Sequence, residues 1–386
     1  MRVALVDPSL FTLPYDAALA RALAAAGHHV VLHARAPRAE DGDAAGLEVA
    51  PDFYPVTEPA AGRRPLPGPL RLLAKGLDHG ASMLRLLARL RRERPDVIHF
   101  QWLPLPALDR AVLPALRRIA PLVLTVHDTE PSNGDASALR RAGFLACLRG
   151  MDRLVVHTAQ GESRLRALGL DPARIARMPH PPLLPVAAGT APDAEDAPPA
   201  VLLLGKIQPY KGADLLVEAF ARLPEALRAA VPLRIVGKPM MDLAPLRALA
   251  EARGVALDLR PGFVPDEAFA ALLSPGTIAA FPYREIEASG VLGIALARGR
   301  PVVASRLGTF AEVLDAPDPP GIAVPPGDAA ALAAALERVL TDRALAARMS
   351  ARALDIARDT AGWAESAAAH AALYEAARST AARPPQ

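Results

Sequence analysis

The sequence predicts an α/β protein built from two Rossmann-like domains, each a doubly wound parallel sheet, which face each other across a cleft. Its 386 residues are enough for two domains of ordinary size, each with its own core. Short β-rich runs alternate with helical patterns in both halves, which favours parallel strands covered by helices on both faces. A run rich in proline, alanine and acidic residues at 185–199 is typical of a linker between them.

The first half, residues 1–184, contains the strands and helices expected of one such domain. Its first helix is expected over 16–26 and ends at Gly27, a residue type common just after a helix. The predicted strands cover residues 2–6, 29–33, 96–100, 121–127 and 153–158.

The same alternation restarts after the linker and predicts a second domain over residues 200–360. Ligands of doubly wound sheets bind at the carboxyl ends of the strands, so we look for function there. An alanine-rich helical tail, 361–386, is expected to pack back towards the first domain. The predicted strands cover residues 200–207, 232–237, 256–262, 277–283, 301–305 and 321–324.

Composition indicates a folded protein, with 52% hydrophobic and 22% charged residues. Cys147 is the only cysteine, which allows no internal disulfide and fits a reducing compartment. No uninterrupted apolar run reaches the length of about 18 residues that a membrane span needs. We therefore expect a cytoplasmic protein.

Positive charge is concentrated in residues 1–190, which carry 24 Lys and Arg against 18 Asp and Glu. Aromatic residues make up only 4% of the chain and do not interleave with basic ones, which argues against a nucleic-acid partner. An anionic membrane surface at the inner face of the membrane explains the charge better.

The helical pattern at 82–94 offers a surface for such contact through a stripe formed by Arg85, Arg89 and Arg92. The alternative is an ordinary surface helix that turns its apolar face into the core. That face holds Met83, Leu86, Leu87 and Leu90.

The second half opens with a stretch, GKIQPYKG, that indicates a diphosphate cradle. A buried strand ends at Gly205, a loop carries Lys206 and an exposed Lys211, and a helix begins near Gly212. Two ammonium groups and the free N–H groups of a helix start attract phosphate oxygens. The spacing of a P-loop and the Gly-x-Gly-x-x-Gly of a dinucleotide site are both missing. The alternative for Lys211 is a solvated lysine, although without an anion it would oppose the helix dipole.

The stretch FPYREIEASGVLGIALARG, 281–299, places Glu287 between a strand and a helix expected over 289–298. The free N–H groups of that helix attract anionic or hydroxyl-rich ligands.

In order, the motifs G-K-x4-K-G, RIVGKP, PGFVPDEAFAALL and FPYREIEASGVLGIALARGRPVVASRLGTFAEVL resemble the nucleotide-sugar half of a GT-B glycosyltransferase. The similarity is to the retaining members of glycosyltransferase family 4. It covers about residues 200–330, and extends more loosely to PDVIHFQW and LVLTVHD in the first half. The resemblance implies transfer of a sugar from a nucleoside diphosphate sugar to an acceptor with retention of configuration, without a metal or other cofactor.

The resemblance also implies roles for individual residues. Lys206 and Lys211 would hold the diphosphate, Glu287 would bind sugar hydroxyls, and His127 would lie beside the donor sugar; His127, Lys211 and Glu287 form the expected catalytic set. The full expected donor-binding set is Gly205, Lys206, Lys211, Gly237, Phe263, Glu287, Ser289, Gly290 and Val291.

Two departures from the family pattern leave alternatives open. Ala295 stands where the family commonly has a second glutamate that contacts the donor ribose, so a non-catalytic nucleotide-sugar-binding partner stays an alternative, as does an epimerase. The family's Gly-Gly near the amino terminus is replaced by DPSLFTLPYDAAL, so the acceptor is not predicted. The Asp-x-Asp at 41–43 is interpreted as a turn, and no metal site is expected.

Overall fold

The computed structural model describes residues 1–38, 41, 44–58, 68–129, 138–187, 198–264, 268 and 271–381. The chain forms two compact units, of which the first comprises Met1–Pro179 with Ala361–Gln386, and the second His180–Thr360. Residues 180–184, which we expected in the first domain, belong to the second because Leu183 and Leu184 pack against its core. Most of the expected linker, residues 188–197, lies outside the described part of the chain.

The first unit is a seven-stranded parallel sheet in the order β3-β2-β1-β4-β5-β6-β7. The strand order reverses direction between β1 and β4, which makes their carboxyl ends the switch point of this sheet. The strands are β1 Arg2–Asp7, β2 His29–Ala34, β3 Glu48–Pro51, β4 Val97–Phe100, β5 Leu122–Thr125, β6 Arg153–Val156 and β7 Ile175–Arg177. The helices are α1 Leu13–Ala25, α2 Gly68–Glu93, α3 Pro106–Arg117, α4 Ala138–Gly150, α5 Ala159–Ala167 and α14 Trp363–Ala381.

Helices cover both faces of this sheet because its strands are apolar on both sides. Along β1, Val3 and Leu5 join one apolar cluster with α1 and α14, while Ala4 and Val6 join another with α2, α3 and α4. Helix α14 comes from the far end of the sequence and is held against this sheet by a hydrogen bond. The hydroxyl of Tyr374 lies 2.7 Å from His99 Nδ1 on β4.

The second unit is a six-stranded parallel sheet in the order β10-β9-β8-β11-β12-β13, with its switch point between β8 and β11. Its strands are β8 Ala200–Leu204, β9 Leu233–Gly237, β10 Leu257–Pro261, β11 Thr277–Phe281, β12 Val302–Ser305 and β13 Gly321–Val324. Its helices are α6 Ala213–Phe220, α7 Glu225–Ala230, α8 Ala244–Ala252, α10 Gly290–Ala297, α11 Gly308–Leu314, α12 Ala329–Thr341 and α13 Arg343–Asp359.

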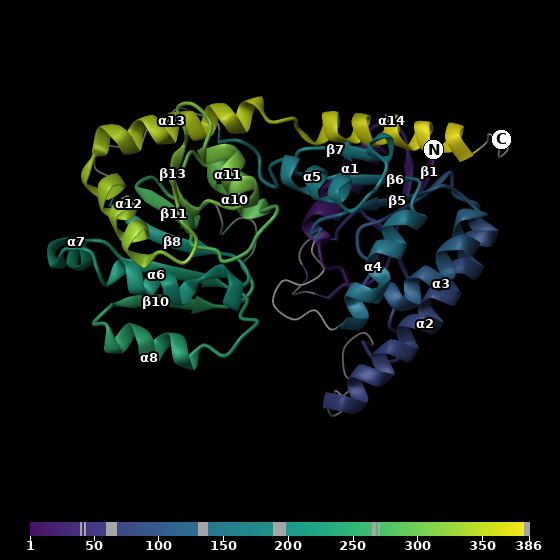
Figure 1. Ribbon diagram of the computed structural model, residues 1–386, viewed down its shortest axis with the longest axis horizontal. Helices are drawn as coiled ribbons and strands as arrows, with labels where there is room; N and C mark the ends of the chain where they lie inside the picture. The colour runs from purple at the N-terminus through teal and green to yellow at the C-terminus, as the bar shows by residue number, and fades with distance from the viewer. Residues whose placement is uncertain are drawn as a thin grey trace. The chain divides into compact units, whose positions relative to one another are not determined.

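The second sheet is also covered on both faces. Val201 and Leu203 of β8 pack with α6, α8 and α12, whereas Leu202 and Leu204 pack with α10 and α11. Figure 1 shows these helices around the strands of the unit. Two doubly wound parallel sheets were predicted from the sequence, and this prediction is confirmed. No helix in the described part of the chain is long and apolar enough to cross a bilayer.

Candidate functional site

Three neighbouring strands of the second unit end in glycines that pack backbone against backbone. Gly205, after β8, has φ +111°, and Gly237, at the end of β9, has φ +151°. A Cβ atom on Gly237 would lie 1.8 Å from the carbonyl oxygen of Gly205, so no side chain fits there. The N–H of Gly262, after β10, donates to the carbonyl of Gly237 at 2.9 Å. Phe263 follows it and is 46% exposed, so its ring is available to a ligand at this edge.

Lys211 is buried, which corrects the expectation of an exposed lysine. It ends a short 3-10 turn, Pro209–Lys211, and its side chain is only 7% exposed. Its Nζ lies 4.9 Å from the centre of the Tyr283 ring, and a Cβ atom on Gly205 would lie 3.1 Å from it. Lys211 is buried because of a tertiary contact. The loop after β11 packs Tyr283 against Lys211, which lies 72 positions earlier in the chain.

Burial lowers the pKa of the Lys211 ammonium below its ordinary value, because leaving water disfavours the charged form. Among the described residues, no carboxylate forms an ion pair with it. A buried ammonium without a counter-ion is costly, and an anionic ligand would offset that cost. Lys206, at the other end of the same loop, is exposed.

The Lys211 turn and the loop after β11 are fastened to each other. Gly212, with φ +67°, caps α6, and a Cβ atom there would lie 2.1 Å from the carbonyl oxygen of Pro282. Arg284 donates from its two terminal nitrogens to the Asp214 carboxylate at 2.9 and 2.8 Å. The N–H of Arg284 also donates to Tyr210 at 2.7 Å. The two loops therefore form one preformed surface.

Glu287 is buried, with 4% of its surface exposed. Its carbonyl oxygen accepts the N–H of Thr309 at 2.9 Å, and Gly308 is so close that a Cβ atom would lie 2.4 Å from that oxygen. The loop is thus held from the start of α11, a segment that the sequence reasoning did not connect with it.

Helix α10 begins where the sequence predicted. Ser289 is its N-cap, in an extended conformation and with no side-chain cap bond, and Gly290 is its first residue. A Cβ atom on Gly290 would lie 3.2 Å from Leu183 and 3.5 Å from Nε2 of His180. Within this unit, the glycine therefore makes room for the segment that enters the domain. Val291 lies against Gly205, since its Cγ2 would be 3.4 Å from a Cβ atom there.

Ala295 is fully buried on α10, among apolar side chains of the core that include Leu292 and Phe281. A glutamate at this position would place a carboxylate among apolar side chains, where a charge is costly. The core of this unit therefore favours an apolar side chain at this position.

His127 lies in the first unit, just after β5, in a partly exposed aromatic cluster. Its ring stacks on Trp102 with 5.4 Å between ring centres and meets the edge of Tyr15 at 5.2 Å. Its Nε2 lies 3.0 Å from Gln101 Oε1, which follows β4. This arrangement orients the imidazole at the carboxyl edge of the sheet. His99, by contrast, is wholly buried and ties β4 to Tyr374 and Thr125.

Two of the three arginines expected to face a membrane are engaged within the first unit. Arg89 Nε donates to Asp52 Oδ1 at 2.8 Å, and Arg85 donates to the Ser82 hydroxyl at 2.7 Å and the Asp52 carbonyl at 3.3 Å. Arg92 is exposed. The apolar face, Met83, Leu86, Leu87 and Leu90, is buried as the core alternative predicts.

Asp41, from the expected turn at 41–43, pairs with Arg35; residues 42 and 43 lie outside the described part of the chain. Within the residues described, no group of three or more His, Cys, Asp or Glu side chains could hold a metal ion.

Comparison with known proteins matches both halves of the chain to glycosyltransferases. Residues 198–342 match the family model described as glycosyl transferases group 1, and residues 17–181 match glycosyltransferase family 4. A D-inositol 3-phosphate glycosyltransferase of Xylanimonas cellulosilytica is 30% identical over 96% of this chain and 92% of the relative. A glycogen synthase of Mycobacterium tuberculosis is 28% identical, over 93% of this chain and 89% of its own length.

Solved structures share the fold at low sequence identity. A sucrose-phosphate synthase from Thermosynechococcus elongatus superposes with a TM-score of 0.76 at 21% identity, covering 98% of this chain and 100% of the other. Anabaena HepE, in complex with UDP and glucose, gives 0.74 at 16% identity, covering 97% and 100%. The chain is a family 4, group 1 glycosyltransferase with the GT-B fold.

Proposed function

We propose that the enzyme takes a sugar from a nucleoside diphosphate sugar held by the second unit and passes it to an acceptor held by the first. The observation that carries this proposal is Lys211, a buried ammonium with no carboxylate partner among the described residues, beside the strand-end glycine Gly205. A diphosphate would supply the missing negative charge. A related fold that contains UDP and glucose, Anabaena HepE, supports the same donor class.

In this proposal the transfer retains the anomeric configuration. The acceptor attacks on the face from which the diphosphate leaves, and the leaving diphosphate takes the acceptor's proton. Lys206 and Lys211 stabilise the negative charge that grows on the diphosphate, a role that a metal ion fills in other enzymes. Glu287 accepts hydrogen bonds from the sugar hydroxyls, and His127 binds beside the sugar from the first unit. Such a reaction depends on positioning and charge more than on a titrating base.

The alternative is a protein that binds a nucleotide sugar without transferring it, for which Ala295 is the motivating residue. Both proposals require the diphosphate cradle, so binding alone does not separate them. Turnover does: a transferase slowly passes the sugar to water even without its acceptor, whereas a binding protein leaves the nucleotide sugar intact.

A thermal-shift screen against UDP, GDP, ADP and their sugars tests the proposal. We expect one nucleoside diphosphate to stabilise the protein and its sugar to be hydrolysed slowly, with an α-linked donor giving first an α-sugar by NMR. Absence of any stabilisation by all three would overturn the donor assignment. First release of the opposite anomer would overturn retention alone.

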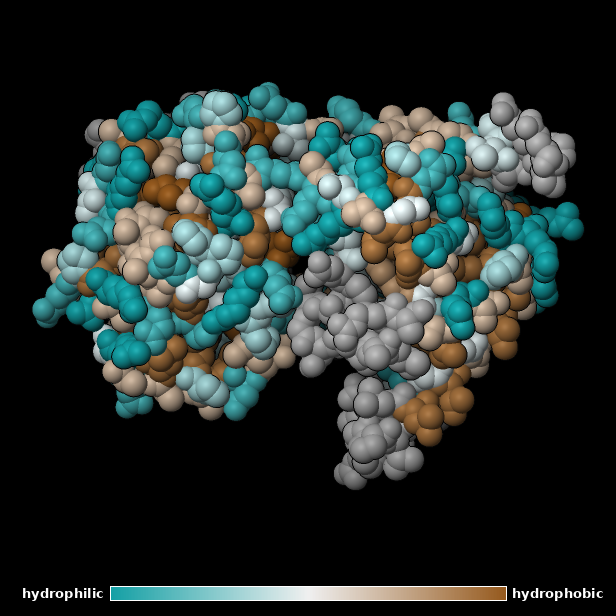
Figure 2. Space-filling model, in the orientation of Figure 1, coloured by the Kyte–Doolittle hydropathy of each residue, from teal (hydrophilic) through white to brown (hydrophobic). Residues whose placement is uncertain are grey.

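We also propose contact with an anionic membrane, through a different face of α2 from the one the sequence suggested. Leu73, Leu77 and Leu84 are 66%, 70% and 60% exposed and share one face of the helix, because they lie four and seven residues apart. Figure 2 shows apolar surface at the α2 end of the first unit. The exposed Arg91 lies on the same face, seven residues after Leu84, and supplies charge complementary to anionic lipid.

Co-sedimentation with phosphatidylglycerol vesicles tests this surface. We expect the substitutions Leu77→Ser and Leu84→Ser together to weaken binding, and rising salt to weaken it further. A matched pair of exposed leucines elsewhere, Leu108→Ser and Leu168→Ser, serves as the control. Equal sedimentation of both double variants would end the proposal.

A further inference from the structure

A buried glutamine joins two histidines of the first unit. Gln101 directly follows β4, and its side chain is 1% exposed. Its Oε1 lies 3.0 Å from Nε2 of His127, and its Nε2 lies 3.4 Å from Nε2 of His99. Its backbone is fixed as well, because its N–H donates at 2.8 Å to the carbonyl of Val6 on β1. The amide of Gln101 is therefore held between the two imidazoles.

The hydrogen-bond partners of His99 determine where its proton lies. Burial lowers the pKa of His99 well below its ordinary value, so its ring is neutral, with one donor and one acceptor nitrogen. Its Nε2 faces the Gln101 amide N–H, which donates and cannot accept, and the Thr125 hydroxyl at 2.8 Å. Nε2 is therefore the acceptor. Nδ1 of His99 carries the proton and donates to the Tyr374 hydroxyl at 2.7 Å.

The same reasoning determines the proton of His127. The amide oxygen of Gln101 only accepts, so Nε2 of His127 carries the proton that faces it. In the neutral ring, Nδ1 is then the acceptor nitrogen. Neighbouring hydrogen bonds in such a chain strengthen one another. Tyr374 therefore influences His127 through His99 and Gln101, although it does not touch it.

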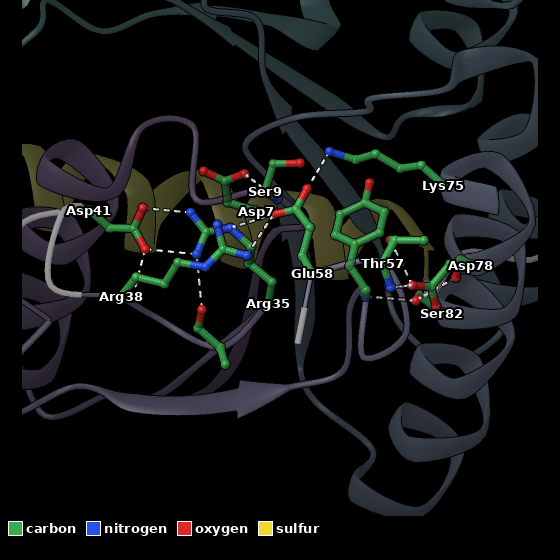
Figure 3. Close-up of polar contacts among 12 residues, drawn as sticks. Asp7, Ser9, Arg35, Arg38, Asp41, Thr57, Glu58, Lys75, Asp78 and Ser82 are labelled. Atoms are coloured by element: carbon green, nitrogen blue, oxygen red, sulfur yellow. Dashed lines mark hydrogen bonds and ion pairs between the residues drawn. The ribbon is translucent and has the colours of Figure 1, made fainter. Parts of the chain in front are cut away.

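An aromatic ring restricts the movement of the His127 side chain. Trp102 stacks on it with 15° between the ring planes, and the indole N–H of Trp102 donates to the Thr12 hydroxyl at 3.1 Å. Thr12 belongs to the loop after β1, which is held by Asp7. The Asp7 carboxylate accepts the N–H groups of Ser9 and Thr12 at 3.2 and 3.0 Å, and Figure 3 shows Asp7 beside Ser9. The stacking partner of His127 is thus fixed to the end of β1.

Stacking does not determine which way round the imidazole lies, because a ring turned by half a revolution has the same shape. The hydrogen bond to Gln101 does distinguish the two orientations, since a turned ring would place a carbon atom towards the amide oxygen.

Helix α14 also supports His127 by a second route. Trp363, its first residue, meets the ring of Tyr15 with 5.3 Å between ring centres, and Tyr15 meets His127 edge-on at 5.2 Å. Trp363 and Tyr374 both lie on α14. A helix from the far end of the sequence therefore supports the histidine at two points.

We infer that Gln101 is a positioning residue that holds His127 in its Nε2–H tautomer and in one ring orientation, and that Tyr374 of α14 fixes Gln101 through His99. The consequence for transfer rests on the proposed function, in which His127 binds beside the donor sugar. A histidine whose donor and acceptor nitrogens are fixed in advance presents one hydrogen-bonding pattern and does not have to reorganise during the reaction.

Nitrogen NMR of the imidazole rings tests the inference on the full chain. At about pH 8.5, about two units above the ordinary histidine pKa, a neutral ring shows which nitrogen carries the proton. The signals of His127 are assigned by their loss in His127→Asn. We expect Nε2 to be protonated in the wild type and in Gln101→Glu, which keeps an acceptor oxygen. Gln101→Met keeps the length of the side chain and removes the amide, so we expect a mixture of both tautomers.

His157 is the reference within each spectrum, because its Nδ1 lies 2.9 Å from the carbonyl oxygen of Met178, which none of these substitutions alters. Tyr374→Phe removes a single hydroxyl and should move part of the His127 signal to the other tautomer. An Nδ1–H tautomer of His127 in the wild type, or an unchanged tautomer in Gln101→Met, overturns the inference. An unchanged tautomer in Tyr374→Phe overturns the contribution of α14.

Turnover of the nucleotide sugar tests the proposed function separately. Gln101→Met should turn it over about tenfold more slowly or worse and keep its affinity for UDP, since the diphosphate cradle belongs to the second unit. Wild-type turnover by His127→Asn would contradict the role of His127 in transfer, whereas the spectra alone decide whether Gln101 positions its ring. A purely structural role for Gln101 predicts a lower melting temperature of Gln101→Met with an unchanged His127 tautomer, and that result would overturn the inference.

Discussion

The two units end their sheets in sites that are built in opposite ways. In the second, backbone meets backbone at Gly205 and Gly237, and the buried Lys211 has no carboxylate partner among the described residues. In the first, the buried cation Arg35 is paired, since Asp41 binds it through two oxygens. An unpaired buried cation favours a ligand that brings its own negative charge. A buried cation that is already paired within the protein instead stabilises the loop to which it belongs.

The largest effect that follows from this contrast is expected for Lys211→Met, which keeps most of the side chain and removes its charge. Turnover of the nucleotide sugar should fall by about 10²-fold or more, because charge that develops on the leaving diphosphate loses a partner. The melting temperature should stay level or rise, since an unpaired buried charge is removed. Arg247→Met, on the exposed side of α8, is the control. Near-normal turnover in Lys211→Met would contradict the cradle.

A smaller effect is expected for Glu287→Gln, which keeps size and hydrogen-bonding capacity but loses the charge. Charge-assisted hydrogen bonds to the sugar are worth roughly 1.5–3 kcal/mol, so kcat/KM should fall by about 10- to 100-fold. Affinity for the free nucleoside diphosphate, measured by calorimetry, should change little. If Glu287→Gln abolishes that affinity, the residue is not a sugar ligand.

Unfolding measurements test the close backbone packing at the strand ends of the second unit. Gly237→Ala should destabilise the second unit by more than Gly254→Ala, although both glycines have positive φ. A Cβ atom meets the Gly205 carbonyl in the first case and open space in the second. We expect about 1 kcal/mol for Gly254→Ala, from its backbone conformation alone, and a larger loss for Gly237→Ala in urea unfolding. Equal losses would mean that the strand ends are not closely packed.

The smallest effect is expected in the first unit, for the neighbouring buried carboxyl groups of Asp7 and Asp16. Burial and the neighbouring Asp7 raise the pKa of Asp16, so the folded protein holds a proton that the unfolded chain releases near pH 3.8. The contribution of the pair to stability is therefore full below that pH and is lost as pH rises through the folded pKa. Asp16→Asn should flatten this part of the pH profile, whereas Asp359→Asn, at an exposed position, should not. Parallel profiles for wild type and Asp16→Asn would show that the pair shares no proton.

The sequence was sufficient for the two sheets and for the loop around Glu287, because alternating strands and helices and a contiguous motif are local signals. It missed β3 and β7, edge strands of four and three residues, since such short segments carry almost no periodic signal. It also missed what depends on distant partners. The ring of Tyr283 that buries Lys211, and the Asp52 that engages Arg89, are brought there only by the tertiary fold.

The central claim is that Lys211 supplies the charge that holds a nucleoside diphosphate, and calorimetry with UDP between about pH 7 and about pH 9 tests it most directly. Burial lowers the pKa of Lys211, so without a ligand its ammonium group loses its proton at a pH below the ordinary lysine pKa of 10.5. Binding of a diphosphate must restore that proton. We predict that wild-type affinity falls as pH rises and that binding takes up protons, more than in Lys211→Met, which binds more weakly throughout. Ionisation of the nucleotide itself affects both proteins alike. Equal affinity and equal pH dependence in the two proteins would contradict the claim.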